Sequence, residues 1–273
     1  MTIRSIYTEN LKPYTTEIGL HKHIREIYRR LHILKAYVWY LFMRPLVVVL
    51  QSTRRDISST DKIQRVGVFC RGPSLELAKE TQNLDLIIIT NEFQKKIKNN
   101  DWLNEKLKTT PTVHFGAAGE PVLSRTQVLR LNIQKYQLSR FKPDGTERSR
   151  REQRHWRRPE SRGLRGRYLS DTVKTSYDKF DGSCLTGQLA VFYASEHFNP
   201  DEVSIYGMDF YESNTYFGGD DAGAKNEGQE RTDELMNIMT SMLDVCSDTS
   251  FTFYTYSAYS PNTKNVHVVS MDE

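Results

Sequence analysis

From residue 65 onward, short apolar runs alternate with longer and more polar stretches. Five runs have the length of strands: residues 66–70, 84–90, 112–115, 203–206 and 251–256. Apolar runs that are separated by polar, helix-length stretches are typical of a mainly parallel sheet whose connections are helices. The sequence therefore predicts an α/β domain in which helices flank that sheet.

Two of the connecting stretches have clear helical patterns. Residues 187–198 place Leu189, Phe192 and Tyr193 on one helical face and lead directly into the run at 203–206. The second pattern begins after Thr232, which we expect to be its N-cap. Its apolar positions recur at helical spacing and predict a core-facing stripe: Leu235, Met239, Met242, Leu243 and Cys246.

The first sixty residues differ from the rest of the chain. Basic residues at 22, 25, 29 and 30 precede an apolar run at 36–50, which Arg44 and Pro45 interrupt. A spanning helix needs roughly 20 apolar residues, so an interfacial or buried helix is favoured. Extending the run back to Leu31 gives a single-pass signal anchor as the alternative. We predict an N-terminal helical segment at 1–60 and the main domain at 61–273, in a protein that is membrane-associated or cytoplasmic.

Charge and cysteine content narrow the classes of partner. The net charge of +4 over 273 residues gives little reason to expect nucleic-acid binding. Three cysteines without metal-type spacing favour a thiol-reducing compartment over a disulfide scaffold. Residues 140–167 carry eleven lysines and arginines. This segment predicts a solvated basic loop, with an anionic acceptor, a phosphate-bearing ligand or an anionic membrane surface as alternative partners.

Three turns of the predicted sheet have residues suited to a nucleotide. Arg71, Gly72, Pro73 and Ser74 follow the first run, where glycine allows close approach to a ligand and Ser74 is expected to cap a helix. Asn91 follows the second run, and its amide can donate and accept hydrogen bonds. Thr186 and Gly187 form another turn before the helix at 187–198. Each turn is also compatible with a purely geometric role.

The stretch after the run at 203–206 is the most specific. Gly207 and Asp209 are followed by Tyr211 and, five residues later, by Tyr216. Phenolic hydroxyls are neutral near pH 7 and can donate hydrogen bonds to a departing phosphate without a metal. The chain also lacks a convincing Asp-x-Asp motif after a strand, so we predict no required metal.

In this order, the motifs resemble those of the bacterial sialyltransferases of glycosyltransferase family forty-two and, more distantly, those of the animal sialyltransferases. That family has a Gly-Asn-Gly-Pro-Ser-Leu turn, an Asn after the next strand, a Thr-Ser-Gly turn and a Gly-Ile-Asp-Phe-Tyr loop with a second tyrosine. The resemblance implies a Rossmann-like fold with a lid, CMP-sialic acid as the donor substrate, a glycan acceptor and no cofactor. The implied donor-binding residues are Arg71, Gly72, Ser74, Asn91, Thr186, Gly187 and Asp209, and Tyr211 and Tyr216 would support phosphate departure.

Several positions depart from the family pattern. The family's histidine general base is absent from the comparable stretch at 227–233, where Glu230 or Glu227 is the candidate base. Arg71 replaces an asparagine, and Ser183 stands where the family has an arginine. Three functions are compatible with these departures: a sialyltransferase with a changed base, a transferase of another nucleotide sugar, and a nucleotide-binding protein that lost catalysis. A protein that binds an anionic membrane surface is the alternative outside these classes.

Overall fold

A computed structural model describes residues 62–91, 93–116, 123–141, 165–179, 184–210 and 231–270, together with Ile27, Leu31 and Ile57. The chain divides into two compact units, Met1–Leu50 and Gln51–Glu273. Ile27 and Leu31 are helical, and the rest of the predicted N-terminal extension up to residue 50 lies outside the described residues. Ile57 is buried in the main core of the second unit. The predicted lid is not among the described elements.

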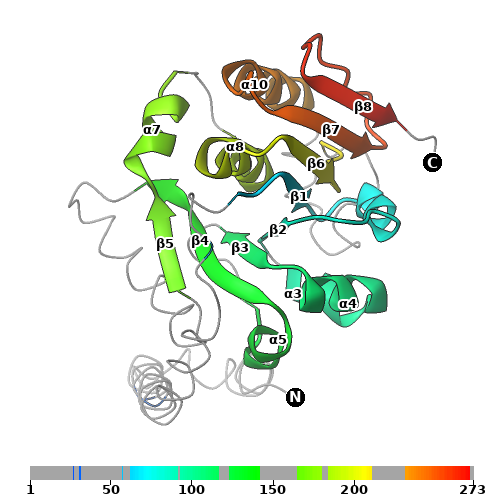
Figure 1. Cartoon of the computed structure of the whole chain (residues 1–273), viewed down its shortest axis with the longest axis vertical. Coiled ribbons are helices and arrows are strands. Elements are labelled where there is room, and N and C mark those ends of the chain that lie inside the picture. Colours follow the sequence, from blue (N-terminus) through cyan, green and yellow to red (C-terminus); the bar gives the residue numbers. More distant parts are fainter. Residues whose placement is uncertain are drawn as a thin grey trace, which may run out of the picture. The chain divides into compact units, whose positions relative to one another are not determined.

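The second unit contains an eight-stranded sheet in which every described pair of neighbouring strands is parallel. The strands are β1 (Arg65–Phe69), β2 (Leu86–Thr90), β3 (Thr112–Gly116), β4 (Ile133–Phe141), β5 (Arg165–Leu169), β6 (Glu202–Tyr206), β7 (Ser250–Thr255) and β8 (Val266–Ser270). Their order is β5-β4-β3-β2-β1-β6-β7-β8 (Figure 1). The predicted α/β, Rossmann-like sheet is confirmed, and its strand order reverses at β1.

Helices cover both faces of this sheet (Figure 1). They are the 3-10 helix η2 (Pro73–Lys79) and the α-helices α3 (Phe93–Lys98), α4 (Asp101–Thr109), α5 (Arg125–Arg130), α7 (Asp171–Tyr177), α8 (Thr186–Phe198) and α10 (Thr232–Val245). Successive side chains of a strand point to opposite faces. Val68 accordingly packs in the core cluster of α8 and α10, whereas Phe69 packs in the cluster of η2, α3 and α4. Burial on both faces explains why the strands are apolar at consecutive positions.

The five strands predicted from the sequence are confirmed to within two residues at each end. Strands β4, β5 and β8 were not predicted, because polar residues interrupt the apolar positions of each. Strand β4 buries Lys135 and Gln137, β5 contains Gly166 and Arg167, and β8 is a half-exposed edge strand. The prediction of a loop over 140–167 was wrong at its ends, which belong to β4 and β5. Residues 142–164 lie outside the description.

The two predicted helices are confirmed as α8 and α10. The methionines at 239 and 242 are buried in the core, as expected from their spacing. The prediction that Thr232 is the N-cap of α10 was wrong, because Thr232 is the first residue of the helix and Arg231 precedes it as the N-cap. The Thr232 hydroxyl instead donates a hydrogen bond to the carbonyl oxygen of Phe210, 3.0 Å away.

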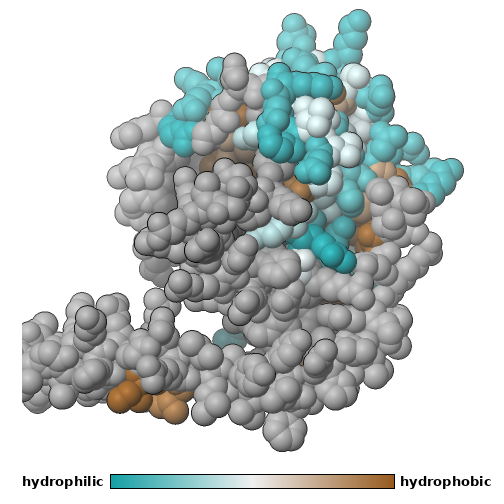
Figure 2. Space-filling view, turned by 90° about the vertical axis from the view of Figure 1, so that its left-hand side faces the viewer, coloured by the Kyte–Doolittle hydropathy of each residue, from teal (hydrophilic) through white to brown (hydrophobic). Residues whose placement is uncertain are grey.

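The described surface bears on the predicted membrane association. Its large exposed apolar side chains are Ile27, Leu31 and Leu129. Figure 2 shows one face, on which the described residues are mainly hydrophilic with small hydrophobic areas. No helix within the described ranges combines the length and the apolar character needed to cross a membrane.

Candidate functional site

The reversal of strand order places the candidate site at the carboxyl ends of β1 and β6. These neighbouring strands continue to the two sides of the sheet through different connections. In open parallel sheets, ligands bind outside the carboxyl ends of the strands at such a point. The turns after β1, β2 and β6 and the start of α8 contain all the predicted donor-binding residues: Arg71, Gly72, Ser74, Asn91, Thr186, Gly187 and Asp209.

The turns after β1 and β6 are bonded directly to each other. The Gly72 N–H donates to the Gly207 carbonyl at 2.8 Å, and the Gly207 N–H donates to Ser74 Oγ at 2.9 Å. Gly207 has a φ of +71°, which glycine adopts without the steric penalty of a side chain. Ser74 does not cap the following helix as predicted: Gly72 is the N-cap of η2, and the Ser74 hydroxyl binds the β6 turn instead.

Asp209 belongs to the turn after β6 and bonds to the turn after β1 and to the end of β7. Its side chain is fully buried, at 0% exposure. Its Oδ2 accepts a hydrogen bond from the Ser74 N–H at 3.2 Å. Its Oδ1 accepts one from Thr255 Oγ1 and one from the Tyr256 N–H, each at 3.0 Å. One carboxylate therefore connects the segments that follow β1, β6 and β7.

Gly187 brings the start of α8 against the end of β1. A Cβ atom on Gly187 would lie 2.8 Å from Cys70 Sγ and 3.2 Å from Met208 Cε, so only glycine allows this approach. Burial raises the pKa of the Cys70 thiol to about 12. Because a thiol with this pKa stays protonated at neutral pH, Cys70 acts as a packing residue and not as a nucleophile.

Asn91 continues the site beyond β2, the strand next to β1. It has a φ of +44°, in the left-handed region that asparagine tolerates better than most residues. Its N–H donates to the Phe115 carbonyl at 2.9 Å, and its own carbonyl oxygen lies 2.7 Å from Nε2 of buried His114. Buried His114 therefore contacts the backbone of a predicted donor-binding residue.

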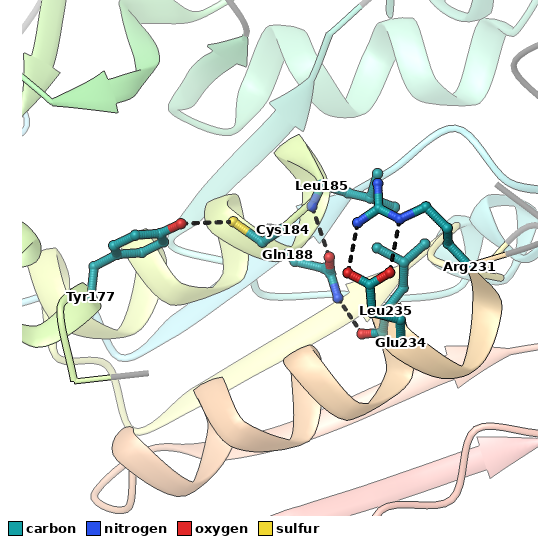
Figure 3. Close-up of polar contacts among 7 residues, drawn as sticks. All are labelled: Tyr177, Cys184, Leu185, Gln188, Arg231, Glu234 and Leu235. Atoms are coloured by element: carbon teal, nitrogen blue, oxygen red, sulfur yellow. Dashed lines mark hydrogen bonds and ion pairs between the residues drawn. The ribbon is translucent and has the colours of Figure 1, made fainter. Parts of the chain in front are cut away.

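A buried glutamine fixes the start of α8 relative to α10 (Figure 3). Gln188 is 0% exposed. Its Oε1 accepts a hydrogen bond from the Leu185 N–H at 2.8 Å, and its Nε2 donates one to the Leu235 carbonyl at 2.5 Å. The first N–H groups of a helix and its dipole attract anions. The start of the 13-residue α8 thus adds an electropositive helix end to the site, next to Thr186 and Gly187.

The predicted catalytic residues Tyr211, Tyr216 and Glu230 lie outside the described residues. Phe210 and Thr232, which lie on either side of residues 211–230 in the sequence, meet beside the site, because the Thr232 hydroxyl donates a hydrogen bond to the Phe210 carbonyl. Phe210 has a φ of +47° and packs against Tyr259 at a ring-centroid distance of 4.8 Å. A left-handed conformation is uncommon for a bulky residue and marks a constrained point of the backbone.

Sequence reasoning missed four contributors to the site: Thr255, Tyr256, His114 as a backbone partner, and Gln188. Thr255 and Tyr256 ended a predicted strand, a signal that places them at the carboxyl edge of the sheet but does not identify Asp209 as their partner. Across the part of the chain that the structure describes, no three His, Cys, Asp or Glu side chains are grouped to hold a metal ion.

No family model, curated protein or solved structure matches the chain. The fold and the candidate site define its class as a doubly wound, parallel α/β protein with glycine-containing turns gathered where the strand order reverses. In this class, that edge of the sheet is the usual place for a ligand.

Proposed function

We propose that this chain is a glycosyltransferase that uses a nucleotide sugar, with its donor site at the carboxyl ends of β1, β2 and β6 and at the start of α8. One observation carries the proposal: motifs far apart in the sequence meet at the reversal of strand order. Ser74 and Asp209, for example, are 135 residues apart and are directly bonded. The same motifs carry the resemblance to sialyltransferases.

The proposed donor is CMP-sialic acid. Asn91, Thr186 and Gly187 would contact the cytidine nucleotide, whose phosphate would accept hydrogen bonds from the first N–H groups of α8. Arg71 lies two residues after the end of β1 and is partly buried. Its guanidinium can bind a phosphate or the sugar carboxylate in a bidentate manner. These groups would hold the nucleotide while leaving the sugar to face an acceptor.

In the proposed transfer, the bond between the anomeric carbon and the phosphate oxygen breaks as a glycan hydroxyl forms a new bond to that carbon. Tyr211 and Tyr216 would donate hydrogen bonds to the departing phosphate. The hydroxyl proton would pass to Glu230 or Glu227 as the general base. The charge on the leaving group is thereby stabilised without a metal.

Calorimetry on the full chain tests the donor site. We expect CMP to bind more tightly than other nucleotides, and Asn91→Ala to weaken CMP binding. Tyr211→Phe and Tyr216→Phe should lower the rate of transfer, because each removes one phenolic donor. Absence of nucleotide binding would overturn the proposal. Transfer that persists when Glu227 and Glu230 are both changed to Gln would exclude them as bases, and a strict requirement for Mn²⁺ would contradict the metal-free reaction.

A second proposal is a membrane-surface binding protein that lacks catalysis. Ile27 and Leu31 are helical, one turn apart, and 57% and 55% exposed. They lie among the basic residues at 22, 25, 29 and 30, a combination that suits an anionic lipid surface. Salt-sensitive binding to anionic vesicles, without any nucleotide binding, would favour this function. Vesicle binding together with CMP binding would instead indicate a membrane-associated transferase.

A further inference from the structure

We infer that Asp209 is a positioning residue of the proposed donor site, which holds the turn after β1 in place and does not itself bind the donor. This inference rests on the proposed function. Both carboxylate oxygens accept hydrogen bonds from groups of the chain, and the side chain has no exposed surface. A carboxylate in this position acts on a ligand only through the backbone that it holds.

Two hydrogen bonds hold Ser74 in the turn after β1. Asp209 Oδ2 accepts from the Ser74 N–H at 3.2 Å. Ser74 Oγ accepts from the Gly207 N–H at 2.9 Å. Gly72 makes room for this arrangement, because a Cβ at that position would overlap Asp209 Oδ2. The position of Ser74 relative to β6 is therefore set by Asp209 and Gly207 together.

The number of donors explains why a carboxylate is needed. Three donors converge on the group: the N–H groups of Ser74 and Tyr256 and the hydroxyl of Thr255. A buried charge is tolerated only when it is well hydrogen-bonded, and bonds to a charged acceptor are roughly twice as strong as neutral ones. An asparagine has one oxygen, which can keep two of these donors. Its NH₂ group would then face the Ser74 N–H.

Asp209 also precedes the constrained backbone at Phe210. The left-handed φ of +47° at Phe210 persists because both sides of the residue are fixed. Asp209 is anchored on one side, and Thr232 Oγ1 binds the Phe210 carbonyl at 3.0 Å. Tyr211, a predicted catalytic residue, is next in the sequence. Asp209 thus connects the predicted donor turn to the residue from which the chain continues to Tyr211.

The test compares Asp209→Asn with Thr255→Val in the full chain. Asp209→Asn places a donor against the Ser74 N–H, so we expect CMP affinity to fall about tenfold, an ordinary effect of one unpaired buried donor. Thr255→Val removes a bond to Oδ1 and keeps the bond that the Ser74 N–H donates to Oδ2. We expect it to lower stability while CMP affinity stays within about threefold of the unaltered protein. Asp248→Asn, an exposed site after α10, is the matched control.

Hydrogen exchange in the unaltered protein adds a measurement that does not depend on a variant folding. The Ser74 and Tyr256 amides should both exchange slowly, since Asp209 accepts from them. Rapid exchange at Ser74 would overturn the inference. So would unchanged CMP affinity in Asp209→Asn, or equal losses of affinity in Asp209→Asn and Thr255→Val. Absence of CMP binding in the unaltered protein would instead overturn the proposed function, and this role of Asp209 with it.

Discussion

Replacing Gly187 with alanine should destabilise the protein, although the same change stabilises most helices. An added Cβ would lie 2.8 Å from Cys70 Sγ, whereas non-bonded heavy atoms normally stay about 3.5–4.0 Å apart. The Met208 methyl group at 3.2 Å can move aside, because it ends a flexible side chain. Cys70 cannot move as easily, since it is buried at the end of β1.

The magnitude follows from two opposing effects. Alanine gains about 1 kcal/mol over glycine in a helix. Overpacking a core costs about 1–3 kcal/mol. We therefore expect Gly187→Ala to lower the free energy of unfolding by about 1 kcal/mol, up to about 2 kcal/mol. Urea denaturation of the full chain followed by circular dichroism measures this loss.

A second substitution separates the steric cause from other effects. Cys70→Ala removes the sulfur that the new Cβ would meet, so adding Gly187→Ala to Cys70→Ala should cost nothing or restore stability. Ser241→Ala, on the exposed side of α10, should gain a few tenths of a kcal/mol from helix propensity alone, to about 0.5 kcal/mol. A gain of stability in Gly187→Ala, or an equal loss with and without the Cys70 sulfur, would refute the reasoning.

Three further outcomes are expected. Gln188→Leu should cost about 1–3 kcal/mol in urea denaturation, because it removes the buried amide that connects the Leu185 N–H to the Leu235 carbonyl. A loss below about 1 kcal/mol would mean that water replaces the amide. Burial, and then the nearby Lys135 charge, lower the pKa of His197 to about 4. The unfolded chain therefore binds more protons than the folded protein below about pH 6.5, and the free energy of unfolding should fall by about 2 kcal/mol from about pH 7 to about pH 5. His197→Phe should remove much of this dependence, and an unchanged pH profile in that variant would contradict the assignment. Asn91→Gly should be more stable than Asn91→Ala by about 1 kcal/mol, because glycine accepts the φ of +44° without strain and alanine does not. Equal thermal stability of the two variants would argue against the left-handed backbone at Asn91.

The central strands could be predicted because they are buried on both sides. Residues such as Val68 and Phe69 face different cores, so nearly every position is apolar and the run is visible in the sequence. Strands nearer the edges lack this signal. Strand β4 is stabilised in part by the stems and polar ends of Lys135 and Gln137, and Gln137 donates to the Arg167 carbonyl of β5. Such pairing depends on a neighbour that local sequence does not reveal.

Some features of the candidate site could likewise be predicted from the sequence, and others could not. Gly72, Asn91 and Gly187 could be singled out because each residue type suits a turn at a strand or helix end. The hydrogen bonds of Asp209 could not be predicted, because they depend on β7 lying beside β6 with Tyr254 opposite Tyr206. That register brings Thr255 and Tyr256 to the carboxylate. Strand order and register are tertiary properties, so the identity of these partners required the structure.

The central place of β1 has a consequence for how the protein is made. Its neighbour β2 follows closely, with Gln64 and Asp85 only 21 residues apart, whereas β6 lies far along the chain, with Gln64 and Asp201 137 residues apart. During synthesis, β1 to β5 can emerge while the other side of β1 has no partner. A strand whose last four residues are buried in the folded protein then forms an open sheet edge, the kind of surface that promotes aggregation and chaperone binding. A chain that stops before residue 202 would keep that edge exposed.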